Sequence, residues 1–168
     1  DPLTLAAVAG DPIPPGLPRH RYLIGLGSNL QPAANLALAR RSLAAIGQRL
    51  LFSAELVTEP VGMVSEHLFH NQVAYMESHL DPVALKSCFN AIETAMGRDR
   101  GDALCKVKDR PIDLDIISEL SPATDLSLLP DDPLIREAPD YNRPLLYDLV
   151  KLLQAEALPP LDGSAVSH

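Results

Sequence analysis

Predicted strands and helices follow one another along this chain in the order strand, helix, strand, strand, helix, strand. Strands are expected where β-branched and apolar residues alternate with polar ones, and helices where longer Ala- and Leu-rich segments begin at a proline. The order is that of a ferredoxin-like α/β sandwich, an α+β fold in which one antiparallel sheet carries helices on one face. The expected strands are residues 22–27, 50–58, 69–80 and 112–118, and the expected helices are residues 32–47 and 82–96.

Residues outside this core are expected to form an arm, an extension and a tail. The Pro-rich residues 10–18 predict a stiff, extended segment. We therefore assign residues 1–20 to an N-terminal arm, 21–158 to one domain and 159–168 to a tail. The extension beyond residue 119 is loop-rich because prolines interrupt it, and it carries a short helix over residues 145–153. The apolar stretch near the first residue is short and lacks a basic start, so we do not expect a signal peptide.

Charge and cysteine content narrow the function classes. The net charge of −8 argues against a general binder of nucleic acid or of anionic membrane surfaces. Cys88 and Cys105 match no metal-ligand spacing and cannot form a framework of several disulfides, which indicates a reducing, cytoplasmic setting. We expect small-molecule partners, with neither nucleic acid nor membrane involved. The sequence leaves the oligomeric state open, with a monomer as the simplest form.

Two carboxylates, Asp113 and Asp115, stand two residues apart in the last expected strand. Alternate side chains of a strand share a face, so both acids project together while Ile112, Leu114 and Ile116 face the core. Neighbouring acids lose hydration and repel each other unless a cation lies between them, and their oxygens suit Mg²⁺, which commonly accompanies phosphates. On the pair alone, a solvent-exposed polar face is an equal alternative.

A cluster of cations precedes this strand in an otherwise acidic chain. Arginine forks bind phosphate oxygens in pairs and neutralise the charge that develops during phosphoryl transfer. The alternative is a solvated surface loop, but together with the two aspartates the cluster favours phosphate binding. Its members are Arg98, Arg100, Lys106, Lys108 and Arg110.

Further positions have a functional and a structural interpretation. Ser28 and Asn29 follow a strand and precede a helix, where an ordinary turn with one of them as N-cap is favoured over a phosphate site. Phe69 and Asn71 share a strand face and could read a flat heterocycle, whereas a core Phe69 beside an exposed Asn71 is equally plausible. Glu93 could form a helix ion pair with the arginine that follows the helix. The histidines show no zinc-ligand spacing.

Five motifs in the same order and approximate spacing resemble the 6-hydroxymethyl-7,8-dihydropterin pyrophosphokinase (HPPK) family. They lie within residues 25–30, 58–62, 69–71, 92–100 and 110–116. The resemblance implies an enzyme of folate biosynthesis that transfers pyrophosphate from ATP to the pterin hydroxymethyl group and releases AMP.

The resemblance also implies residue roles. Asp113 and Asp115 would hold two Mg²⁺ ions against the triphosphate, and Asp115 would be catalytic together with Arg98 and Arg110. Residues implied in nucleotide binding are Asn90, Glu93, Arg100, Arg110 and Ile116, and those implied in pterin binding are Thr58, Val61, Phe69, Asn71 and Asp113.

Two departures from the family pattern support a second hypothesis. Val107 stands where the family carries a tryptophan, and the run from Pro130 to Pro133 has aspartates where the family carries a histidine that touches phosphate. The alternative is a diverged relative, non-catalytic or of altered specificity, that serves as a pterin- or nucleotide-binding or interaction module.

Overall fold

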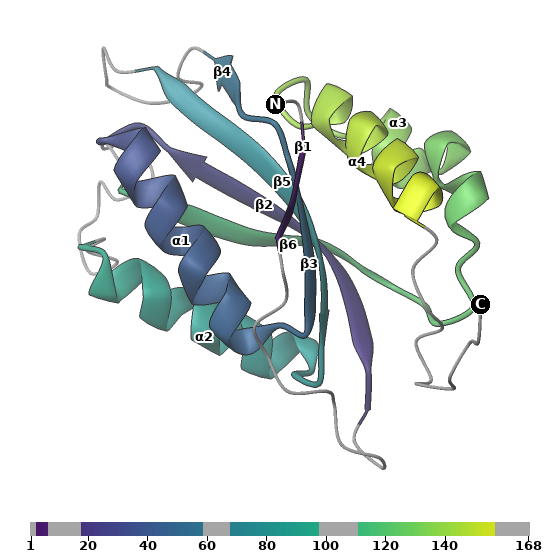
Figure 1. Cartoon of the computed structure of the whole chain (residues 1–168), viewed down its shortest axis with the longest axis horizontal. Helices are drawn as coiled ribbons and strands as arrows, with labels where there is room; N and C mark the ends of the chain where they lie inside the picture. Colours follow the sequence, from purple (N-terminus) through teal and green to yellow (C-terminus); the bar gives the residue numbers. More distant parts are fainter. Residues whose placement is uncertain (1–2, 7–17, 59–67, 98–110, 157–168) are drawn as a thin grey trace.

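A computed structural model of the chain describes residues 3–6, 18–58, 68–97 and 111–156, and its centre is one antiparallel sheet (Figure 1). The strands lie in the order β1-β3-β5-β2-β6, and the short β4 also pairs with β5. Leaving β1 aside, this is the strand order of a ferredoxin-like sandwich, so the predicted fold is confirmed. The strands are β1 (Leu3–Ala6), β2 (His20–Ser28), β3 (Arg49–Ser53), β4 (Leu56–Thr58), β5 (Phe69–Ser78) and β6 (Asp113–Leu120).

Helices cover both faces of the sheet, not one as the sequence predicted (Figure 1). Helices α1 (Pro32–Ile46) and α2 (Pro82–Ala95) pack on one face, and α4 (Arg143–Glu156) packs on the other, next to η1 (Leu126–Asp131) and α3 (Pro133–Arg136). The second layer forms because α4 presents a leucine-rich face to the sheet; the helix is also longer than the expected 145–153. None of the described helices is long and apolar enough to cross a membrane.

Strands β2, β3, β5 and β6 each contribute to two separate cores because their side chains alternate between faces. On β2, Tyr22 and Ile24 point to the core beneath α1 and α2, whereas Leu23 points to the core beneath α4. Leu114 of β6 belongs to the first core. The neighbouring Asp113 and Asp115 therefore project on the α4 face, as the alternation predicted.

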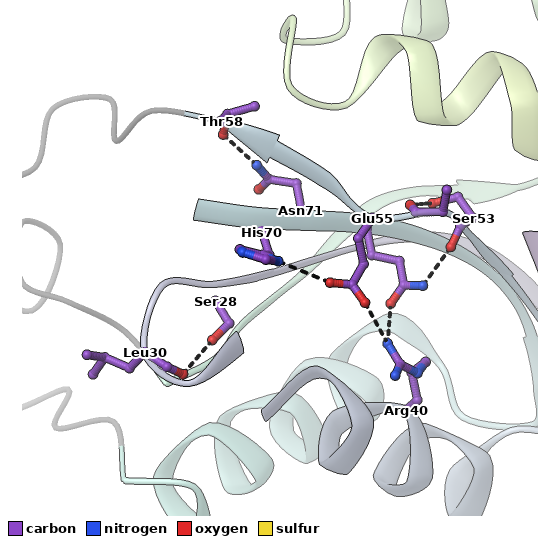
Figure 2. Close-up of polar contacts among 10 residues, drawn as sticks. Ser28, Leu30, Arg40, Ser53, Glu55, Thr58, His70 and Asn71 are labelled. Carbon is purple, nitrogen blue, oxygen red and sulfur yellow. Dashed lines mark hydrogen bonds and ion pairs between the residues drawn. The ribbon is translucent and has the colours of Figure 1, made fainter. Parts of the chain in front are cut away.

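Local hydrogen bonds explain where helix α2 begins, and they correct the predicted N-cap of α1, whose predicted start at Pro32 is confirmed. The Asp81 carboxylate accepts a hydrogen bond from Ala84 N at 2.8 Å, which confirms Asp81 as the N-cap of α2. The predicted N-cap at Ser28 or Asn29 is wrong, because α1 begins after Gln31, which has a φ of 40° and makes no side-chain capping bond. Ser28 Oγ instead donates to the carbonyl of Leu30 at 3.0 Å, within the turn (Figure 2).

Two further differences concern the strands. The predicted strand 50–58 is interrupted, because Phe52 pairs with Ala74 but Leu56 pairs with Asn71. Residues 53–55 therefore face two residues of β5, and the extra residue makes a β-bulge between β3 and β4. Within the predicted arm, β1 adds an edge strand beside β3 that the sequence analysis did not expect.

Candidate functional site

Four of the predicted site residues, Phe69, Asn71, Asp113 and Asp115, lie toward one end of the sheet, on the face against which α4 packs. Strand register places Asp113 of β6 opposite Gly27 of β2, and Gly27 opposite Asn71 of β5. Directly opposed residues point to the same face. The acidic strand and the strand of the predicted pterin residues are therefore separated by the single strand β2.

Glycine clears the surface between these two groups. A Cβ atom at Gly27 would lie 3.3 Å from Asn71 Oδ1 and 3.4 Å from Phe69 Cε1, so the Phe69 ring and the Asn71 amide lie directly over this glycine. The prediction that Phe69 and Asn71 share a face is confirmed. The alternative with an exposed Asn71 is wrong, since Asn71 is only 7% exposed.

A hydrogen bond fixes the orientation of the Asn71 amide. Asn71 Nδ2 donates to Thr58 Oγ1 at 2.8 Å, from β5 to β4 (Figure 2). Because the donor end is used in this way, Asn71 Oδ1 is the end that lies over Gly27. The pair Thr58–Asn71 thus presents an oriented acceptor next to an aromatic ring, a combination suited to a flat heterocycle with N–H donors.

The Asp113–Asp115 pair concentrates negative charge at the other end of this surface. The pKa of Asp115 is raised to about 6, first by partial loss of hydration among protein atoms and then by the charge of Asp113, to which it is also hydrogen-bonded. The Glu93 charge adds to this effect, while Lys86, whose Nζ lies 3.9 Å from Asp115 Oδ1, opposes it. The side chain of Asp115 is 60% exposed, so solvent can reach the pair and screens these interactions.

This pair fits a hard divalent cation. In the part of the chain that the structure describes, no group of three or more His, Cys, Asp or Glu side chains has metal-binding geometry. Magnesium needs no such protein cage, because one or two carboxylates plus water and substrate phosphates complete its coordination. An accessible pair of neighbouring carboxylates, with the pKa of Asp115 raised by partial loss of hydration and by the charge of Asp113, is a suitable partial ligand set.

Glu93 holds the acidic strand from helix α2. Its side chain is fully buried, and Oε2 accepts a hydrogen bond from Leu114 N at 2.8 Å. Leu114 stands between Asp113 and Asp115 on β6, which is an edge strand among the described strands, so its outward N–H groups pair with none of them. Glu93 therefore fixes the backbone that carries both aspartates, a contact that the sequence analysis did not anticipate.

The α2 face that meets β6 carries two further polar residues. Lys86, Asn90 and Glu93 are spaced so that they share one side of the helix. Asn90 Oδ1 is buried and has no hydrogen-bond partner among the described residues, so it is an unsatisfied acceptor. Ile116 of β6 is partly buried and packs against the core beneath α1 and α2.

Sequence reasoning missed two residues of this neighbourhood. Lys86 could have been found, because it precedes the predicted residue Asn90 by one helical turn. Asn142 carries no such signal: its Nδ2 would lie 3.8 Å from a Cβ atom at Gly25, which places it over the sheet beside the acidic pair only through the tertiary fold.

Several predicted residues lie outside the described part of the chain: Val61, Arg98, Arg100, Val107 and Arg110.

Among the departures from the family pattern noted near Pro130, Asp132 has a structural role. Its carboxylate caps α3 by accepting a hydrogen bond from Leu134 N at 2.9 Å.

Comparison with known proteins identifies relatives over most of the described domain. A model of the family described as 7,8-dihydro-6-hydroxymethylpterin-pyrophosphokinase (HPPK) matches residues 23–138, which is more than half of the chain. Proteins named 2-amino-4-hydroxy-6-hydroxymethyldihydropteridine pyrophosphokinase, from two strains of Porphyromonas gingivalis, are 35% identical over 96 residues. The match covers 56% of this chain and 65% of each relative, so it spans slightly less than two thirds of their length.

Proposed function

The chain belongs to the HPPK family, and from this membership we propose that it transfers pyrophosphate from ATP to 6-hydroxymethyl-7,8-dihydropterin, releasing AMP, in folate biosynthesis. One observation carries the proposal beyond the family match. The acidic pair of β6 and the Phe69–Asn71 pair of β5 lie on the same face, one on each side of Gly27. A triphosphate at the first pair and a pterin at the second would meet over β2.

The pterin end of the site is proposed to bind by stacking and hydrogen bonding. The Phe69 ring offers an apolar surface, and Asn71 Oδ1 offers an acceptor that Thr58 holds in one orientation. Glycine at position 27 keeps the backbone surface low beneath both side chains. Val61 and the backbone near Thr58 are proposed to complete recognition of the pterin edge.

The phosphate end is proposed to hold Mg²⁺ on Asp113 and Asp115, with two ions when ATP is present. When bound, Mg²⁺ would neutralise the triphosphate and draw charge from the bond that breaks. Glu93 keeps the two aspartates at a fixed position through Leu114 N. Asn90 Oδ1 is proposed to accept a hydrogen bond from the nucleotide base, next to Ile116, with Glu93 and Arg100 as further nucleotide contacts.

The reaction proposed for this site is a direct displacement. The pterin hydroxymethyl oxygen forms a bond to the β-phosphorus of ATP, and the bond from that phosphorus to the oxygen shared with the α-phosphorus breaks. AMP leaves with that oxygen, and the hydroxyl proton passes to solvent. The chain contributes orientation of both substrates and, through Arg98 and Arg110, positive charge for the transferred group.

We also propose that ATP and the pterin are the only partners the activity needs. The net charge of −8 does not favour nucleic acid or an anionic membrane surface. A monomer in the cytoplasm is the simplest setting for these substrates.

Product analysis with the purified full chain tests the proposal. The expected result is AMP formation that requires both hydroxymethyldihydropterin and Mg²⁺, that is lost in Asp115→Ala, and that persists in Asp148→Ala, a matched change at an exposed position on α4. Formation of ADP, or ATP hydrolysis without pterin, would contradict it. Intact pterin binding without turnover would instead support the diverged, non-catalytic alternative.

A further inference from the structure

We propose that Arg40 of α1 is a positioning residue for the Thr58–Asn71 pair, and that it acts from the opposite face of the sheet. This inference rests on the proposed function, because it assigns a further residue to pterin recognition. Arg40 and the two residues it contacts, Glu55 and Gln72, lie outside the motifs that the sequence analysis singled out. The juxtaposition that carries it is a chain of polar contacts from α1 to the β-bulge directly behind the site (Figure 2).

Arg40 reaches two segments at once. Its Nη1 donates to Gln72 Oε1 of β5 at 2.9 Å and lies 3.8 Å from Glu55 Oε2, in the bulge that precedes β4. Glu55 Oε1 in turn lies 3.2 Å from Nδ1 of His70 on β5 (Figure 2). We call these four residues, Arg40, Glu55, His70 and Gln72, the bulge clamp.

The bulge depends on side chains because its backbone ladder is interrupted. Gln72 Nε2 donates to the carbonyl of Ser53 at 2.6 Å, and Ser53 Oγ accepts from Val73 N at 3.0 Å. These contacts take the place of regular strand pairing where three residues face two. Gln72 is only 4% exposed, so losing its partner Arg40 would leave a buried amide oxygen unpaired.

Strand alternation connects the clamp to the site. His70 and Gln72 point toward α1, whereas Phe69 and Asn71, the residues interleaved with them, point to the site face. Holding His70 and Gln72 therefore also holds the backbone of Asn71 between them. Glu55 likewise holds the backbone that leads into β4, a strand that is only three residues long and ends in Thr58.

Arginine is suited to contacting β5 and the bulge at the same time, and an apolar residue is not. A planar guanidinium presents several donors in a fixed fork, so one side chain can engage an amide and a carboxylate from two different segments. An apolar residue at position 40 would fill space beside the sheet but could satisfy neither Gln72 Oε1 nor Glu55. The clamp therefore sets the relative position of β4 and β5, and with it the geometry of the Thr58–Asn71 hydrogen bond.

Direct binding of 6-hydroxymethylpterin, followed by its own fluorescence, tests the inference. Arg40→Met is compared with Arg41→Met, the same change at the next and exposed position of α1. We expect the pterin Kd to rise about five- to tenfold in Arg40→Met, a loss of about 1–1.4 kcal/mol by the tenfold conversion, with kcat and the KM for ATP within twofold of wild type. Arg40→Lys keeps the positive charge and should recover part of the loss, and Arg41→Met should match wild type.

A second measurement does not depend on activity. Amide hydrogen exchange at Val57 and Thr58 should become faster in Arg40→Met and stay unchanged in Arg41→Met. Unchanged exchange together with an unchanged pterin Kd would overturn the inference, as would equal losses for both substrates, which indicate general destabilisation. If wild type neither binds pterin nor forms AMP, the proposed function fails, while the exchange experiment still decides whether Arg40 holds β4.

Discussion

Replacing Asp115 by Asn should stabilise the metal-free protein near neutral pH and abolish its response to Mg²⁺. In the folded protein the pKa of Asp115 is raised from 3.8 to about 6, mainly by partial loss of hydration and by the Asp113 charge. Above about pH 6 the folded chain therefore carries a carboxylate in a place that disfavours its charge. An amide of the same shape removes that cost.

The size of the effect follows from the shift and from solvent exposure. A difference of two pKa units corresponds to about 3 kcal/mol for a group shielded from water. The side chain of Asp115 is 60% exposed, so screening reduces the effect to the range of about 0.5–1 kcal/mol that exposed charge interactions reach. For a chain of this length the expected gain is a Tm higher by about 1–4 °C.

The pH dependence of stability independently checks whether Asp115→Asn stabilises or destabilises the protein. Because the folded pKa lies above the unfolded one, wild type holds the stabilising proton below about pH 4 and loses that stability as the pH rises through about 6. The advantage of Asp115→Asn should therefore be absent near pH 4, grow up to pH 6 and stay constant above it. Thermal unfolding across this range, with and without Mg²⁺, measures it.

Asp148→Asn, on the exposed side of α4, controls for the general effect of removing one negative charge from an acidic chain. It should keep the Tm increase that Mg²⁺ gives to wild type, whereas Asp115→Asn should lose it. An equal pH-dependent gain in both variants, or a Mg²⁺ response that survives in Asp115→Asn, would refute the reasoning about the acidic pair.

Two other substitutions test the geometry of the site. Gly27→Ala should weaken pterin binding about fivefold or more, because the new Cβ would lie 3.3 Å from Asn71 Oδ1. Gly25→Ala should leave binding unchanged, because its Cβ would meet its first neighbour at an ordinary 3.6 Å. Equal pterin affinities of the two variants by calorimetry would count against a glycine surface beneath the ligand. In urea unfolding, Glu93→Gln should keep most of the stability because an amide oxygen can still accept a hydrogen bond from Leu114 N. Glu93→Leu should lose about 1–3 kcal/mol of unfolding free energy because it leaves that donor buried and unpaired. Similar losses in both variants would show that this hydrogen bond is not what Glu93 contributes.

Local sequence patterns predicted the parts of the fold that neighbouring residues decide. Asp81 followed by a proline predicts the start of α2 because the capping bond closes within three residues. The two-residue spacing of Asp113 and Asp115 predicts a shared face because side-chain alternation belongs to any strand. The same reasoning placed Phe69 and Asn71 together.

One wrong prediction has a local cause: Ser28 does not cap α1, since its hydroxyl donates to the carbonyl of Leu30, two residues further along the chain. The other two depend on contacts between distant segments. The bulge before β4 depends on how β5 pairs with both β3 and β4, and no residue between 50 and 58 indicates it in the sequence. The second helical layer depends on α4 finding an apolar sheet face, which the alternating pattern of single strands does not reveal.

The sequence by itself determined the order of the core elements, the family and the acidic pair, because these depend on short-range periodicity and on motifs that can be recognised along the chain. Only the tertiary structure decided that Gly27 separates the acidic pair from Asn71, that Glu93 holds the strand between two aspartates, and that Arg40 braces the bulge behind the site. Each of these contacts joins residues more than 12 positions apart in the sequence. Strand register and helix packing bring them together, and neither is encoded in any single local pattern.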